Sequence, residues 1–123
     1  MDYVVNLDQA AAEINSRLQS WTAAGLVPGP ITWRDEAAAW SQRLEIDRAV
    51  VADPDSVGVF LQTRDEQNAL NIVLYRGGWA DVEGLIHDAI ILECPKITTA
   101  VQFGGVLDTA VARFQDTDRP TRR

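Results

Sequence analysis

The sequence is poor in the residues from which disulfides and metal sites are built. Its 123 residues include one cysteine, Cys94, and one histidine, His87. A single cysteine excludes an internal disulfide, which fits a reducing compartment. A zinc ion would need carboxylates to complete its ligand set, and no suitable ligand spacing is present. We therefore expect neither a metal nor any other cofactor.

Long hydrophobic runs are also lacking. No apolar stretch approaches the roughly 18 residues that a membrane-spanning helix requires. The first residues carry an acid and lack the basic region that opens a secretion signal. We therefore expect a cytoplasmic protein without a membrane anchor.

Positive charge is scarce. Eleven Lys and Arg face 18 Asp and Glu, which gives a formal net charge of -7. Nucleic-acid binding depends on neutralising phosphates with Lys and Arg, so we expect no direct contact with nucleic acid. The excess of acid serves solubility, and it equally suits a surface that meets a basic partner. Both interpretations stay open.

Hydrophobic side chains are spaced for one helix near each end of the chain. The first stripe consists of Leu7, Ala11, Ile14, Leu18 and Trp21, and the second of Phe103, Leu107, Ala110, Val111 and Phe114. Asn6 with Gln9, and Thr99 with Gln102, have the capping-box spacing. Gly25 is the expected end of the first helix.

Between these helices the apolar period changes to two, which is typical of strands. The predicted strands lie at 31–33, 40–47, 57–62, 70–75, 79–83 and 87–93, with turns at 53–56, 65–68 and 77–78. Short strands with short polar turns predict an antiparallel meander. The expected fold is α+β, with a sheet of five or six strands and both helices on one face. Residues 1–114 form one domain in this interpretation, and 115–123 form a disordered tail.

No group of residues indicates catalysis. The glycine pairs at 77–78 and 104–105 lack the spacing and the lysine of a phosphate-binding loop. His87 and Glu93, on one face of a strand, would stand about 20 Å apart at about 3.3 Å per residue. They cannot act together within that strand, so we do not expect an enzyme.

Residues 77–83 suggest a binding surface. Alternation places Trp79, Asp81 and Glu83 on one face, and Ala80 and Val82 on the other. If the second face is the core side, a tryptophan flanked by two carboxylates faces solvent. That composition is typical of a hot spot for an arginine-rich partner. The opposite orientation would bury Trp79 at a sheet edge.

The partner-binding residues expected from this reasoning combine the 79–83 segment with acids of two turns and a neighbouring tyrosine. They are Trp79, Asp81, Glu83, Asp65, Glu66, Asp53, Asp55 and Tyr75. The turn acids would steer a basic partner toward the face that carries Trp79.

The outline of the chain resembles the small immunity proteins of bacterial polymorphic toxin systems. The resemblance rests on Gly77-Gly78-Trp79-Ala80-Asp81-Val82, on Glu93-Cys94-Pro95, and on the final helix with Phe103, Leu107 and Phe114. It implies a compact acidic domain that neutralises a cognate toxin, such as a nuclease with a basic active-site surface, by covering that site. The resemblance transfers no catalytic residues. We expect a monomer.

Two other classes of protein stay open. A secretion chaperone is also small, acidic and α+β, and would normally be a homodimer that holds an extended effector segment. A small enzyme or ligand-binding domain would need a deep pocket around His87.

Overall fold

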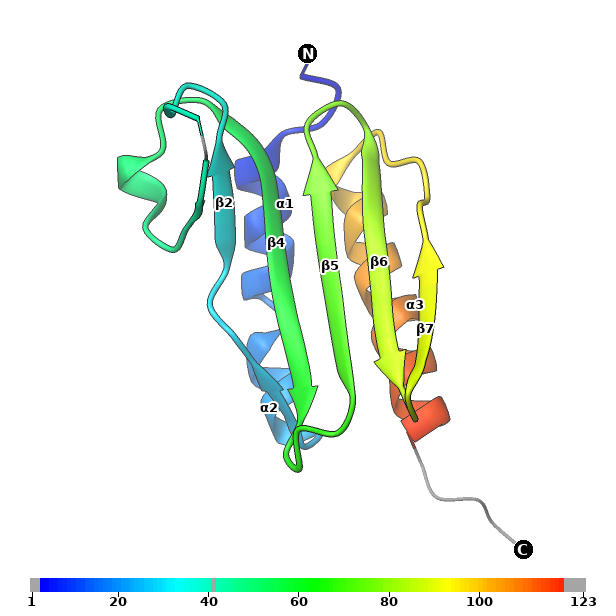
Figure 1. Ribbon diagram of the computed structural model, residues 1–123. Helices are drawn as coiled ribbons and strands as arrows, with labels where there is room; N and C mark the ends of the chain where they lie inside the picture. Colours follow the sequence, from blue (N-terminus) through cyan, green and yellow to red (C-terminus); the bar gives the residue numbers. More distant parts are fainter. Residues whose placement is uncertain (1–2, 41, 119–123) are drawn as a thin grey trace, which may run out of the picture.

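The computed structural model describes residues 3–40 and 42–118, and it shows one antiparallel sheet with helices on one side (Figure 1). The chain runs through α1 Leu7–Asn15, α2 Leu18–Ala23, β1 Leu26–Pro28, β2 Thr32–Asp35, β3 Leu44–Glu45, a 3-10 helix Arg48–Val50, β4 Pro54–Thr63, β5 Ala69–Tyr75, β6 Trp79–Ile86, β7 Ala89–Glu93 and α3 Ala100–Asp118. The predicted α+β fold, with both terminal helices on one sheet face, is confirmed.

The sheet has seven strands rather than five or six. Its order is β3-β2-β4-β5-β6-β7, and all pairs are antiparallel. The short β1 pairs with residues 61–63 of β4, while β2 pairs with residues 54–58 of the same strand. The two short strands thus lie end to end along β4, which is why sequence periodicity alone undercounted the strands.

The first helical segment divides into α1 and α2. Asn6 caps α1, since its side chain accepts a hydrogen bond from the Gln9 backbone N–H at 2.9 Å. The Arg17 N–H then bonds to the carbonyl of Ile14 at 2.9 Å, a tighter turn that separates the two helices. Gly25, with φ of 95°, ends α2 as predicted.

The second helix begins as the sequence predicts. The Gln102 N–H donates to Thr99 Oγ1 at 3.0 Å, and Gln102 Oε1 accepts from the Thr98 N–H at 2.8 Å. The helix continues through Asp118, so the prediction of a disordered tail is wrong for residues 115–118. A ring nitrogen of His87 lies 3.1 Å from the Thr117 carbonyl, and this contact supports the last turn. Residues 119–123 lie outside the described part of the chain.

Gly104 lets α1 and α3 approach closely. A Cβ at this position would overlap the Glu13 carboxylate and come within 2.9 Å of Arg17 Nη2. Arg17 also forms a bidentate pair with Asp108 on α3, at 2.7 and 3.1 Å. Glycine costs helix stability, and here it leaves room for the Glu13 and Arg17 side chains of the α1 region against α3.

The apolar stripes of the helices meet the buried side of the sheet. The largest fully buried side chains include Phe103, Phe114, Ile14, Leu61, Ile72, Leu74 and Leu107. They come from both helices and from the central strands β4 and β5. The opposite side of the sheet carries no helix (Figure 1).

Several predicted strand or turn boundaries are wrong. The 79–83 strand continues to Ile86 as β6. Among the described residues of the 40–47 segment, Leu44–Glu45 alone forms a strand, and Trp40 is 91% exposed in a loop. The 53–56 segment is not a turn, because β4 begins at Pro54. His87 and Asp88 do not belong to a strand; they form the β6–β7 turn, with φ values of 51° and 65°.

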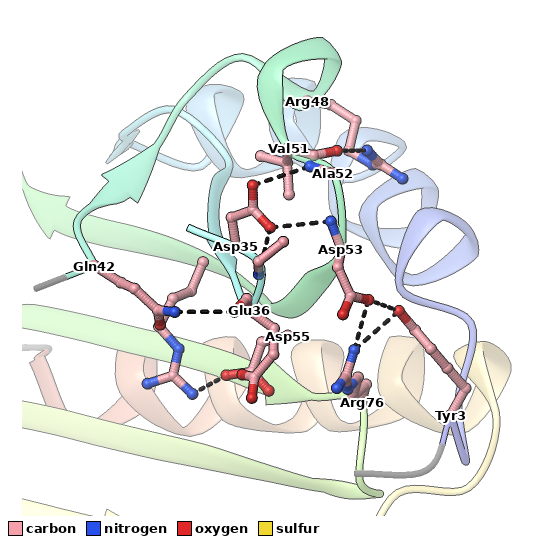
Figure 2. Close-up of polar contacts among 12 residues, drawn as sticks. Tyr3, Asp35, Glu36, Gln42, Arg48, Val51, Ala52, Asp53, Asp55 and Arg76 are labelled. Carbon is pink, nitrogen blue, oxygen red and sulfur yellow. Dashed lines mark hydrogen bonds and ion pairs between the residues drawn. The ribbon is translucent and has the colours of Figure 1, made fainter. Parts of the chain in front are cut away.

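Asp35 explains why the chain leaves the sheet after β2. Its carboxylate accepts backbone hydrogen bonds from Ala37, Ala52 and Asp53, each at 3.0 Å (Figure 2). These bonds fix both ends of the intervening loop. The bonds from Ala52 and Asp53 are the main reason why the pKa of Asp35 lies below its ordinary value, against the opposing effect of burial.

Acid is expected to weaken this connection. A depressed folded-state pKa stabilises the fold fully above the unfolded value of about 3.9, and that stabilisation is lost as the pH falls through the folded value. The free energy of unfolding, measured with urea, should be higher for the wild type than for Asp35→Asn. This difference should be constant above about pH 5 and should narrow below it. An equal difference in unfolding free energy at pH 7 and pH 2 would contradict the stabilising role of the ionised Asp35 carboxylate.

Candidate protein-interaction surface

The side of the sheet that faces away from the helices, called here the open face, is an ordered grid of side chains. Alternate residues of β5 and β6 are buried toward the helices, and the others point outward. Cross-strand pairing sets the rows: Phe60, Asn71, Glu83 and Leu92 form one, and Gln62, Ala69, Leu85 and Ile90 form the next. Residues far apart in sequence thus become neighbours.

Four large apolar side chains of these two rows are exposed and form an apolar patch. The exposed fractions are 43% for Phe60, 44% for Leu85, 74% for Ile90 and 60% for Leu92. A hollow of about 300 Å³ is lined by Phe60, Leu85 and Ile90 together with Asn71 and Glu83. Exposed apolar side chains that gather in one place mark interaction sites more often than scattered ones do.

Glu83 lies within the apolar patch and has no partner of its own. Asn71 and Leu92 are its neighbours across the strands. No cation or hydrogen-bond donor in the described residues contacts its carboxylate. An unpaired carboxylate beside the apolar Leu85 and Leu92 favours a cationic group from a partner.

Asp81 supplies a second negative charge on the open face. The Cys94 thiol donates to its Oδ1 across a sulfur–oxygen distance of 3.4 Å, and this bond is the main reason why the pKa of Cys94 is raised. The pKa of Tyr75 is also raised, first by burial and then by the charge of Asp81. Both neighbouring groups therefore stay protonated at neutral pH, and Asp81 keeps its charge uncompensated by them.

Trp79 lies on the open face, as alternation predicted, because Ala80 and Val82 are buried on the core side. It stacks on Tyr75 with ring centroids 5.0 Å apart, and only 37% of it is exposed. Lys96 pairs with it through an isolated bridge and places an exposed amine at this end. Trp79 therefore supports the sheet edge as well as contributing surface.

Two predicted steering residues are engaged within the fold. Asp55 is 0% exposed and pairs with Arg34. Asp53 accepts hydrogen bonds from the Tyr3 hydroxyl and from Arg76, the latter at 2.7 Å (Figure 2). The prediction that these two residues steer a partner is corrected here. Both carboxylates stabilise the start of β4, because β4 begins earlier than the sequence indicated.

Asp65 and Glu66 occupy the β4–β5 turn, at the far end of β5 from Trp79. Asp65 accepts hydrogen bonds from the Thr63 hydroxyl at 2.7 Å and from the Gln67 N–H at 3.0 Å, and the Thr63 bond is the main cause of its lowered pKa. The turn directly follows the row of Gln62. Its acids therefore adjoin the apolar patch and not Trp79.

Sequence reasoning missed the apolar patch itself. Phe60 alternates with Val59 and Leu61, which are both fully buried, and the alternation of the 57–62 strand alone shows only that Phe60 lies on the other face. The sequence signal that could have indicated the patch is that β4 and β7 each carry large hydrophobic residues on both faces. Only the register places Phe60 of β4 and Leu92 of β7 in the same row.

A second concave surface lies between β7 and α3. It is a groove of about 670 Å³, lined by Val82, Glu93, Cys94, Pro95, Gln102, Gly105, Val106, Thr109, Ala110 and Arg113. Arg113 crosses it to pair with Glu93, with one contact at 3.1 Å. His87 is not part of this groove, since it lies in the β6–β7 turn.

Within residues 3–40 and 42–118, no three His, Cys, Asp or Glu side chains converge as a metal site would require. The helices of that same portion are too short or too polar to span a membrane. Comparison with known proteins found no matching family model, no similar curated protein and no similar solved structure.

Proposed function

We propose that this chain is an immunity protein that binds a cognate toxin through the open face of its sheet and blocks the toxin's active site. The observation that carries the proposal is the apolar patch, Phe60, Leu85, Ile90 and Leu92, around the unpaired carboxylate of Glu83. Burial of the patch would supply affinity, and a partner's Arg or Lys would pair with Glu83.

The overall charge supports a basic partner. A net charge of -7 attracts a positively charged surface over long range and raises the association rate. Asp81 extends the negative surface toward Trp79, and Asp65 and Glu66 extend it beyond the apolar patch. This distribution suits a toxin whose active site binds an anionic substrate, as the resemblance to immunity proteins also implies.

A charge and polarity reversal within the patch should abolish binding. The tagged wild-type chain, expressed in its native cell, is expected to retain a toxin and suppress its activity. The double variant Glu83→Lys, Leu85→Glu should raise Kd at least about 30-fold, equivalent to about 2 kcal/mol. Association of the wild type should slow as salt increases.

The matched control is Val101→Lys, which changes an exposed apolar residue on α3, away from the open face. It should bind like the wild type. Retention of the toxin by the double variant, with circular dichroism showing that it is folded, would place the interface elsewhere.

The exposed β7 strand favours a second candidate function, a secretion chaperone. Such a protein holds an effector segment in extended form, and Ile90, Ile91 and Leu92 offer an apolar strand edge for it. The two functions differ in the state of the bound partner. Proteolysis of the complex should leave a toxin intact and folded, whereas an effector segment held by a chaperone should be cleaved rapidly outside the contact.

A further inference from the structure

Strand β7 forms one edge of the sheet, and its outer backbone groups face away from β6. The Ala80 N–H donates to the Pro95 carbonyl at 3.0 Å, and the Ile97 N–H donates to the Gly78 carbonyl at 2.9 Å. Backbone groups alternate in direction along a strand. The odd-numbered residues of this segment therefore face β6, and Ile90 and Leu92 direct their N–H and C=O groups outward.

Proline and a β-bulge, two features that often protect an edge strand, are absent from β7, and its one charged residue, Glu93, lies at its end and pairs with Arg113. Exposed edges are commonly blunted by inward-pointing charges, proline or a bulge. All five residues of β7 are exposed, and Ile90, Ile91 and Leu92 are consecutive apolar residues. The pairing with β6 is regular from Ile86↔Ala89 to Val82↔Glu93. Such a strand is suited to pairing with another strand.

We propose that two copies of this chain pair through β7, antiparallel and about a two-fold axis at Ile91. In this register Ile90 lies opposite Leu92 of the second copy, and by symmetry Leu92 lies opposite Ile90 of the second copy. Both residues have outward backbone groups, so their N–H and C=O groups all find partners. Ile91 meets its own copy, and Glu93 lies opposite Ala89, so no like charges face each other.

The neighbouring registers are less favourable. A shift toward the turn would require Asp88, whose φ is 65°, to pair as part of a strand. A shift the other way would place the charged Glu93 opposite the apolar Ile91. The register centred on Ile91 pairs all five residues of β7, with Ile90, Ile91 and Leu92 opposite apolar residues and Glu93 opposite the small Ala89.

The helix side of β7 leaves room for this arrangement. A two-fold axis perpendicular to the sheet keeps both α3 helices on the same side, each beside its own groove. The strand contact uses the five residues of β7 on each side, fewer than the about 20–30 residues a side of a stable interface, so we expect a dimer that dissociates at micromolar concentration.

The purified chain is expected to change from monomer to dimer across the micromolar range in sedimentation velocity. Leu92→Pro should remain monomeric at concentrations at least tenfold higher, because proline removes an outward N–H and none of the bonds to β6. Val101→Lys, an exposed substitution outside β7, should dimerise like the wild type. A wild type that stays monomeric, or a folded Leu92→Pro that dimerises equally, would overturn the proposal.

A crosslink tests the register even if Leu92→Pro fails to fold. Ile91→Cys in a Cys94→Ser background should form an intermolecular disulfide on mild oxidation, since residues opposed at non-hydrogen-bonded positions have Cα atoms about 4.5 Å apart. Val101→Cys in the same background should not. A dimer that does not crosslink through position 91 would overturn the two-fold register.

Dimerisation does not rest on the proposed function, and salt distinguishes the two. Two acidic copies repel each other, so added salt should strengthen the dimer, whereas it should slow association with a basic toxin. If one of these two salt effects is not observed, the other hypothesis, dimerisation or toxin binding, is not affected.

Discussion

Phe103→Ala is expected to lower the free energy of unfolding by about 3–5 kcal/mol. Phe103 is 0% exposed and lies on the face of α3 that packs against α1 and the sheet. Truncation removes one of the largest fully buried side chains and leaves a cavity in the core. Urea unfolding followed by circular dichroism measures the change.

The loss is large compared with the total stability of a small domain, about 5–15 kcal/mol. The control is Val101→Ala, two residues earlier on α3, where the side chain is 78% exposed. It should change stability by no more than about 0.5 kcal/mol. Similar small effects at both positions would mean that α3 does not pack on the sheet as described.

The sequence predicted the helices well because their signals are local. Asn6 and Thr99 cap their helices through side-chain bonds that span three residues. Each apolar stripe at 3.6-residue spacing could also be recognised from the residues of one helix alone. The division of the first helix at Arg17 was not predictable, because Arg17 reaches Asp108, 91 residues away.

The strands that sequence alternation missed or misplaced are those fixed by distant contacts. The loop after β2 is held by Asp35 through bonds to Ala52 and Asp53. The two-residue turn at 87–88 uses left-handed φ values at His87 and Asp88, residues that do not announce such a turn as glycine would. Tertiary structure therefore decided these boundaries.

The candidate surface was predictable only in part, because alternation within one strand is a local signal and the register between strands is not. Alternation over five residues placed Trp79, Asp81 and Glu83 on the open face correctly. It could not show that Trp79 is stacked on Tyr75, or that Asp55 is buried. Nor could it join Phe60, Leu85 and Leu92 into one patch, because that requires the register of four strands.

Asp55 and Arg34 form a pair whose disruption should have the other large effect. Both carboxylate oxygens of Asp55 are buried, and Arg34 Nη2 contacts Oδ2, whereas Oδ1 has no hydrogen-bond partner among residues 3–40 and 42–118. The Arg34 guanidinium is therefore the group that compensates this charge. It also lies 5.8 Å from the centre of the Tyr75 ring, so the pair borders the aromatic end of the open face.

Arg34→Leu is expected to cost about 3–5 kcal/mol, because it leaves a buried carboxylate without a counter-charge. The double variant Arg34→Leu, Asp55→Leu should recover most of that loss, since an apolar pair of similar volume removes the uncompensated charge. Urea unfolding of the wild type, both single variants and the double variant gives the coupling free energy.

The control for this cycle is Arg43→Leu. Arg43 also pairs with a carboxylate, Glu45 at 3.4 Å, but its side chain is 85% exposed. Water compensates both groups of such a pair, so its loss should cost no more than about 1 kcal/mol. If Arg34→Leu behaves like Arg43→Leu, water reaches Asp55 in the folded protein. If the double variant loses the sum of the two single effects, Arg34 and Asp55 act independently.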